Sequence, residues 1–204
     1  MKLYHLVTGL LRVNAYFLVN DKGEAILIDC GENYKKIKQT ESDLSVNVKA
    51  VLLTHAHFDH SGCAKKLQDD GAAIYISALD AHKLADDGNL ASHFGRKFDY
   101  LTPDYIFNDG DKLSILGIDL KVMSTPGHTD GSVCFIVDNM IFSGDTLFYG
   151  SVGRTDFPTG NRYDMTASVR KLFALDGDYS VYPGHDQFTT LERERKYNVM
   201  AEYD

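Results

Sequence analysis

Short apolar runs, many with alternating polar positions, recur along the chain and are typical of β-strands. The strands they predict cover residues 2–8, 14–20, 23–29, 48–53, 72–77, 113–116, 118–124, 132–138, 140–143 and 179–182. Segments with helical spacing of apolar residues predict helices over residues 32–41, 60–71, 79–86, 163–175 and 190–200. The chain therefore alternates strands with helices in its first half and returns to strands in its second.

This arrangement predicts an α/β fold. Sheets in both halves, with helices between and after them, indicate a four-layer αββα sandwich in which two mixed β-sheets are flanked by helices. We find no linker, internal repeat or low-complexity tract, so one domain over residues 1–204 is expected. Residues 87–105 have the weakest pattern, and we expect a long loop or broken helix that covers a site.

Composition narrows the class of protein. The chain has 204 residues, 44% of them hydrophobic, and no apolar run that approaches a membrane span or a secretory signal, so we expect a cytoplasmic protein without a membrane partner. Its three cysteines include no CxxC pair, which argues against a disulfide frame or a thiolate zinc site. A net charge of -8 argues against nucleic-acid binding, leaving a small molecule as the expected partner.

The densest chemistry lies at residues 54–60, which read Thr-His-Ala-His-Phe-Asp-His directly after a predicted strand. In extended chain His55 and His57 project to the same side, so both can face one ion. Asp59 is typical of a helix N-cap, and the turn there aims Asp59 and His60 at a second ion. The alternative is a polar loop with chance histidines. With eight histidines in the whole chain, such a cluster is improbable by chance.

Three later residues repeat one theme, a ligand-type side chain at a glycine-bearing turn after a strand: His128, Asp145 and His185. Two metal sites follow, one from His55, His57 and His128 and one from Asp59, His60 and His185, with Asp145 as the bridge. Each ion keeps a position for a shared water, as a catalytic site requires. Nitrogen and oxygen ligands predict two Zn²⁺ ions, with iron or manganese as chemical alternatives.

This pattern, HxHxDH followed by a distant His, an Asp and a final His, resembles the metallo-β-lactamase superfamily. Residues 150–158 and 182–185 look like the glyoxalase II branch (hydroxyacylglutathione hydrolases) and its relatives, the persulfide dioxygenases. The ligands assigned above agree with those that the resemblance implies. Asp145 stands where many antibiotic-hydrolysing members have cysteine, so we do not expect a β-lactamase. The longer glyoxalase II enzymes add a C-terminal helical domain, and the resemblance here is to a short form that ends at Asp204.

The chemistry that follows is hydrolysis of a small thioester or ester, with metal-bound hydroxide as nucleophile. Two ions lower the pKa of bound water to about 7 and hold the oxyanion, and a thiolate of pKa about 8.5 leaves without a strong acid. Asp59 is the candidate catalytic base. The main alternative is a single-iron persulfide dioxygenase that uses His55, His128 and Asp145. Further alternatives are another hydrolase of the same fold, such as a lactonase or nuclease, and a non-catalytic binding protein. The non-catalytic alternative predicts that metal-ligand residues are missing from the sequence.

Polar residues at neighbouring strand ends are expected to accept or relay hydrogen bonds from the imidazole N–H groups: Asp29, Thr54 and Ser143. For Asp29, the alternative is a turn-forming residue.

Three residues are candidates for substrate binding: Arg154, Tyr149 and His93. Arg154 offers bidentate recognition of a carboxylate, with a structural salt bridge to Asp156 as the alternative. For Phe157 we expect packing rather than substrate contact.

Overall fold

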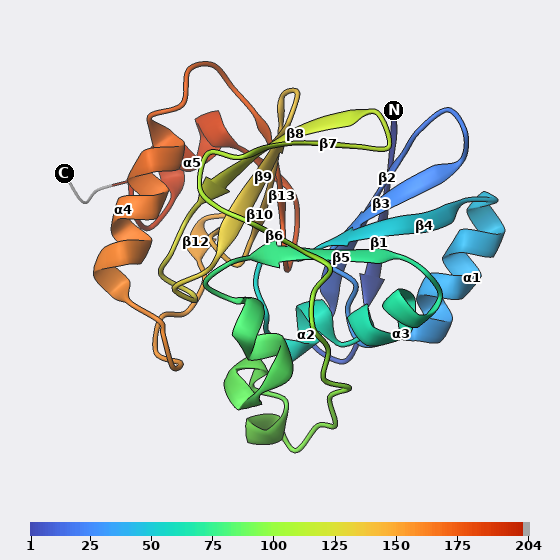
Figure 1. Ribbon diagram of the computed structural model, residues 1–204. Helices are drawn as coiled ribbons and strands as arrows, with labels where there is room; N and C mark the ends of the chain where they lie inside the picture. Colours follow the sequence, from blue (N-terminus) through green and yellow to red (C-terminus); the bar gives the residue numbers. More distant parts are fainter. Residues whose placement is uncertain (202–204) are drawn as a thin grey trace.

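Two six-stranded sheets lie face to face in the computed structural model, which describes residues 1–201, and helices cover their outer faces (Figure 1). The first sheet has the order β1 (Lys2–Thr8), β2 (Val13–Val19), β3 (Glu24–Ile28), β4 (Asn47–Leu52), β5 (Ala73–Ser77) and β6 (Tyr105–Phe107). The second has the order β14 (Thr189–Thr190), β13 (Ser180–Pro183), β10 (Met140–Gly144), β9 (Val133–Val137), β8 (Ile118–Ser124) and β7 (Lys112–Ile115). Both sheets are mixed, because β3 to β6 pair in parallel and so do β10 and β13. The predicted αββα sandwich is confirmed.

Alternation along the central strands explains the layers. On β2, Tyr16 and Leu18 point into the core between the sheets, whereas Phe17 packs on the outer side. That outer side is covered by α1 (Tyr34–Leu44) and α3 (Ala64–Asp69). α4 (Arg162–Phe173) buries Met165 and Val169 against the second sheet, and α5 (Leu191–Tyr197) lies beside α4 (Figure 1). Because both faces of a central strand such as β2 are covered, its sequence is apolar at successive positions instead of alternating between apolar and polar residues.

The helix predicted over residues 60–71 is wrong as a single element. The chain instead forms α2 (Phe58–Ser61) and then α3, with Gly62 and Cys63 between them. The carbonyl of His60, which a continuous helix would use, accepts from the backbone N–H groups of Cys30 and Gly31 at 2.8 and 3.1 Å. The predicted N-cap is also wrong, because His57 precedes α2 and Asp59 lies in its first turn.

Several other boundaries differ from the prediction. Residues 79–86 contain a 3₁₀ helix at Ala81–Ala85, and two more, Asp87–Asn89 and Ser92–Phe94, occupy the segment predicted as a loop or broken helix. The sequence did not predict the short strands β6 and β14, or the two-stranded ribbon of β11 (Leu147–Phe148) and β12 (Ser151–Val152). The single-domain prediction extends to residues 202–204, which lie outside the described residues.

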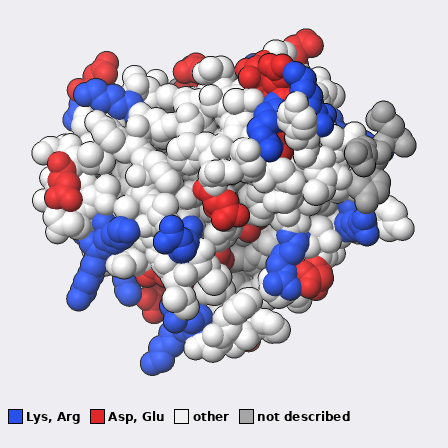
Figure 2. All heavy atoms as spheres, turned by 180° about the vertical axis from the view of Figure 1, so that it is seen from behind, with Lys and Arg blue, Asp and Glu red and all other residues white. Residues whose placement is uncertain are grey.

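The surface carries both signs of charge. Figure 2 shows Lys and Arg side chains interspersed with Asp and Glu on the face turned away in Figure 1, with an acidic group near its middle, and no continuous basic stripe crosses the part formed by described residues. That face lacks the concentrated positive charge that phosphate binding uses. Across residues 1–201, every helix is too short or too polar to span a bilayer.

Candidate metal centre

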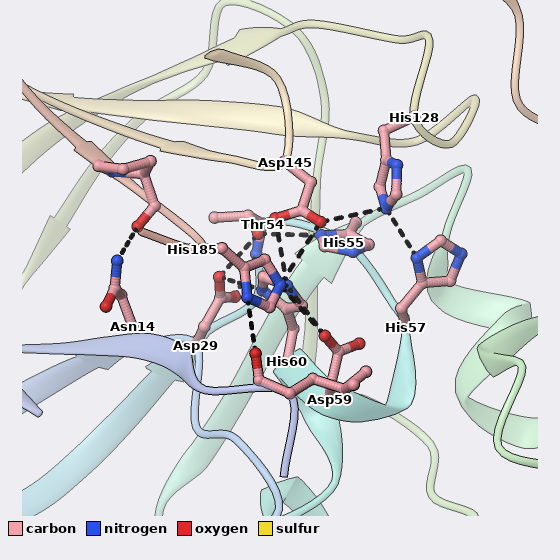
Figure 3. Close-up of polar contacts among 12 residues, drawn as sticks. Asn14, Asp29, Thr54, His55, His57, Asp59, His60, His128, Asp145 and His185 are labelled. Carbon is pink, nitrogen blue, oxygen red and sulfur yellow. Dashed lines mark hydrogen bonds and ion pairs between the residues drawn. The ribbon is translucent and has the colours of Figure 1, made fainter. Parts of the chain in front are cut away.

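The seven predicted ligand residues meet where loops following β4, β8, β10 and β13 converge (Figure 3). The first group consists of His55, His57 and His128, whose ligand atoms lie within 4.8 Å of one another. Nδ1 of His57 and Nε2 of His128 are only 2.9 Å apart. As predicted from strand alternation, the rings of His55 and His57 face the same space, with centroids 4.7 Å apart.

The second group consists of Asp59, His60 and His185, again within 4.8 Å. Nε2 of His185 lies 3.3 Å from Nε2 of His60 and 3.3 Å from Oδ2 of Asp59. The short helix α2 places Asp59 and His60 here, and the turn after β13 brings His185 from far along the chain. The side chains of both predicted triads thus lie close together, and their roles as metal ligands stay a prediction.

Asp145 lies between the two groups. Its Oδ1 is 3.3 Å from Nε2 of His60, and its Oδ2 is 3.4 Å from Nε2 of His128. His55, His60 and Asp145 form a third set with ligand atoms within 4.8 Å. A Cβ on Gly184 would collide with both Asp145 Oδ1 and the His60 ring, so only glycine leaves this space open.

The donor set fits divalent cations. Nε2 of His55 and Oδ1 of Asp145 are buried without a hydrogen-bond partner, which is rare for polar atoms unless an ion or water completes them. Burial, together with neighbouring histidines, lowers the pKa of His55 well below its ordinary value and that of His57 to about 3. Both rings therefore keep the lone pairs that a metal needs at neutral pH.

The electrostatic potential at the second group is negative. Burial lowers the pKa of His60, but Asp145, Asp29 and Asp59 raise it by more, so that the net pKa lies well above the ordinary value. Three carboxylates around one imidazole thus favour a positive charge at that spot. A bound dication would satisfy the same potential.

Hydrogen bonds at Nδ1 fix the orientations of the His60 and His55 rings. Nδ1 of His60 contacts Oδ2 of Asp29 at 2.8 Å, and Thr54 Oγ1 donates to the same Asp29 oxygen at 2.8 Å while lying 3.1 Å from Nδ1 of His55. These bonds leave each Nε2 free to face the centre. Asp29 also has φ of 52°, so the turn-forming alternative holds together with the predicted role.

Backbone carbonyls form hydrogen bonds with the rings of His128 and His185. Nδ1 of His128 bonds the carbonyl of Arg154 at 2.8 Å, and Nδ1 of His185 bonds that of Leu11 at 3.1 Å. The sequence prediction for Ser143 is wrong, because its hydroxyl donates to the Leu147 carbonyl at 2.8 Å and so closes the turn that carries Asp145.

Sequence reasoning missed two buried polar residues that support these loops. Asn14 donates to the carbonyls of Pro183 and Asp186, on either side of His185, at 2.9 and 3.0 Å (Figure 3). Asp80 accepts at Oδ2 from the Ala56 N–H, between two candidate ligands, at 2.9 Å and from Thr129 Oγ1, next to His128, at 3.0 Å. A polar residue inside an apolar strand was the available signal for Asn14.

Asp80 is itself neutralised by a buried lysine. Lys83 Nζ lies 2.6 Å from Asp80 Oδ1, with side-chain exposures of 3% and 0%, and also contacts Asp130 and Thr159. One carboxylate therefore links the loop of the first two histidines to the loop of His128. Nothing in the local sequence distinguishes Asp80 from the other acidic residues of its segment.

The candidate substrate residues fare differently. Arg154 lines the cavity above the centre, but its Nε and Nη2 bond Asp156 at 2.7 Å each, which is the salt-bridge alternative. Tyr149 and His93 do not line this cavity, which corrects both predictions. The Arg193 guanidinium stacks on Tyr149, and the His93 ring packs edge-on against Phe94.

Phe157 departs from expectation in the other direction. It packs in a small apolar cluster and also lines the cavity, with its ring 6.1 Å from that of His57. The prediction of packing alone was therefore incomplete.

Comparison with known proteins agrees with this fold. The family model of the metallo-beta-lactamase superfamily matches residues 8–185, and the chain belongs to that family. The superfamily binds divalent metals, and the chain is a metallo-hydrolase of that superfamily.

Individual relatives are similar over nearly their whole length. The hydroxyacylglutathione hydrolase GloC of Haemophilus influenzae is 35% identical over 91% of this chain and 91% of its own. Among solved structures, the B3 metallo-beta-lactamase BLEG-1 superposes with a TM-score of 0.93 at 31% identity, covering 98% of this chain and 100% of that chain. TTHA1623, solved in a di-iron-bound form, gives a TM-score of 0.87 at 32% identity, covering 96% and 98%.

Proposed function

We propose that the protein is a binuclear metal-dependent hydrolase of a small thioester or ester, similar to glyoxalase II. The observation that carries the proposal is the geometry of the centre: two His-containing triads, a carboxylate between them, and two buried ligand atoms without hydrogen-bond partners. The likeness to GloC, a hydroxyacylglutathione hydrolase, supports the thioester class.

Two bound divalent cations would supply hydroxide at neutral pH and hold the developing oxyanion. The chain supplies the rest. One ion would be held by His55, His57 and His128. The other would be held by Asp59, His60 and His185, and Asp145 would bind both ions.

Asp59 is the candidate proton acceptor. Burial raises its pKa, but His60 and His185 lower it by more, so the pKa lies below its ordinary value and the carboxylate is ionised at neutral pH. It also lines the cavity above the centre. We propose that Asp59 takes the proton of the attacking water. An Asp59→Asn protein that keeps both ions and full turnover would dispose of this role.

The substrate proposal is tested with S-lactoylglutathione and thioesters of other thiols. Metal-loaded protein should hydrolyse a thioester, chelation should abolish turnover, and His128→Ala should reduce it at least a hundredfold. His82→Ala is the matched control, because His82 is exposed and belongs to none of the candidate groups. Absence of turnover with every thiol carrier would defeat the thioester claim.

The same metal-loaded protein can be tested for two other activities. The likeness to BLEG-1 makes β-lactam hydrolysis a second candidate, for which nitrocefin is the substrate, although Asp145 in place of cysteine argues against it. One iron per chain with oxygen consumption would instead indicate the dioxygenase chemistry. We further propose a cytoplasmic location, since Cys30, Cys63 and Cys134 are buried free thiols, as in a reducing compartment.

A further inference from the structure

The cavity above the candidate metal centre has an apolar wall. It encloses about 400 Å³, and its polar floor consists of candidate ligands, among them His57, Asp59 and His185. Six apolar side chains form the remainder of the lining, together with Arg154: Leu11, Phe58, Leu90, Phe94, Phe148 and Phe157. A substrate that reaches the candidate ligands therefore lies against hydrocarbon along the wall of the cavity.

The wall includes large apolar groups that solvent still reaches. Leu11 and Phe94 are each 43% exposed, although they belong to distant parts of the chain. Phe94 packs edge-on against Phe157 with ring centroids 5.8 Å apart and lies 5.4 Å from the ring of Phe58. Leaving such surfaces in water is unfavourable, and an apolar ligand between them would remove both from solvent.

The charges of the lining disfavour an anionic carrier. Apart from the candidate metal centre itself, Arg154 is the single cation among the described lining residues, and its guanidinium is engaged by both oxygens of Asp156 and stacked 3.9 Å above the Phe157 ring. Glutathione brings two carboxylates and would find no unpaired cation in this lining. An uncharged hydrocarbon group needs none.

We propose that the natural substrate is a thioester or ester with an uncharged hydrocarbon substituent of several carbons, which binds between Leu11, Phe94 and Phe157. This inference rests on the proposed hydrolase function and specifies its substrate class. Leu11 also contacts the candidate metal centre, because its carbonyl forms a hydrogen bond with His185. The same residue therefore lines the proposed substrate site and orients a candidate ligand.

Two series of uncharged thioesters test the proposal with the metal-loaded protein. One varies the acyl group from acetyl to hexanoyl on N-acetylcysteamine, and the other varies the thiol from ethanethiol to hexanethiol under a constant acetyl group. We expect kcat/KM to rise about two- to fourfold for each added methylene in at least one series, from about 0.8 kcal/mol per fully buried methylene. S-lactoylglutathione should be hydrolysed more slowly than the best member of that series.

Variants connect the gain to the wall. Leu11→Ala and Phe94→Ala should each reduce the gain per methylene, and together lower it below twofold, whereas Ile106→Ala should leave it unchanged. Ile106 is the matched control, being 60% exposed on edge strand β6 and outside the cavity lining.

Chelator-sensitive turnover with a flat dependence on chain length in both series, or a preference for S-lactoylglutathione, would overturn this inference and leave the hydrolase function intact. Absence of turnover with every thioester would overturn this inference together with the thioester claim of the proposed function.

Discussion

The buried ion pair between Lys83 and Asp80 gives the sharpest prediction about how the centre is held together. Lys83→Met removes the ammonium group and leaves the Asp80 carboxylate buried with its two remaining donors, the Ala56 N–H and the Thr129 hydroxyl. Breaking a buried pair costs roughly 3–5 kcal/mol. Because two donors remain, we expect about 3 kcal/mol, or about 6–12 °C in Tm for a chain of this size.

Urea and thermal unfolding of the chelated protein measure this cost without a contribution from metal binding. Lys65→Met is the matched control, because Lys65 pairs with Asp69 on an exposed helix face and such pairs contribute less than about 1 kcal/mol. The double variant Asp80→Asn/Lys83→Met should be at least as stable as Lys83→Met alone. An amide oxygen still accepts the two hydrogen bonds, and the unpaired charge is gone.

A result for Lys83→Met within about 1 kcal/mol of the natural sequence, and so indistinguishable from the Lys65→Met control, would refute this reasoning. It would mean that Asp80 and Lys83 do not depend on each other for burial. The link between the two ligand-bearing loops would then have to come from other contacts.

Three further predictions concern the metal and the thiols. Asp29→Asn should weaken metal binding roughly 10- to 100-fold in a competition titration, because His60 loses the carboxylate that orients it, while Asp43→Asn on the α1 surface should not change it. A divalent metal at 100 times its Kd should stabilise the folded chain by about 2.7 kcal/mol over the chelated form in urea unfolding, and no shift would contradict a folded-state site. Burial raises the pKa of Cys63 to about 12 and that of Cys134 to about 11. Above pH 9 the unfolded chain therefore loses its thiol protons before the folded chain does, and the free energy of unfolding should fall as the pH rises toward 11–12. Equal stability at pH 8 and pH 10.5 would contradict this.

The clustering of the candidate ligand residues was predictable because their signal is local. His55, His57 and His60 follow a strongly apolar strand, and His128 and His185 each follow a strand and a glycine, so the sequence itself indicates that they lie at strand ends. Strand alternation also indicates that His55 and His57 face the same side, whereas the division of the ligands into two triads stays a prediction.

Features set by distant contacts were not predictable. The break between α2 and α3 depends on the His60 carbonyl accepting from Cys30 and Gly31, and Ser143 turns toward Leu147 rather than an imidazole. Asp80 resembles other acidic residues until the fold brings Ala56 and Lys83 to it. Residues whose partners lie far along the chain require the structure.

Metal content per chain tests the central claim most directly. Purified protein loaded with zinc or iron and freed of excess metal should hold two ions per chain by elemental analysis, and Asp145→Ala should lower that number. A single ion per chain in the natural sequence, or two ions that Asp145→Ala leaves unchanged, would contradict a paired centre with Asp145 between the ions.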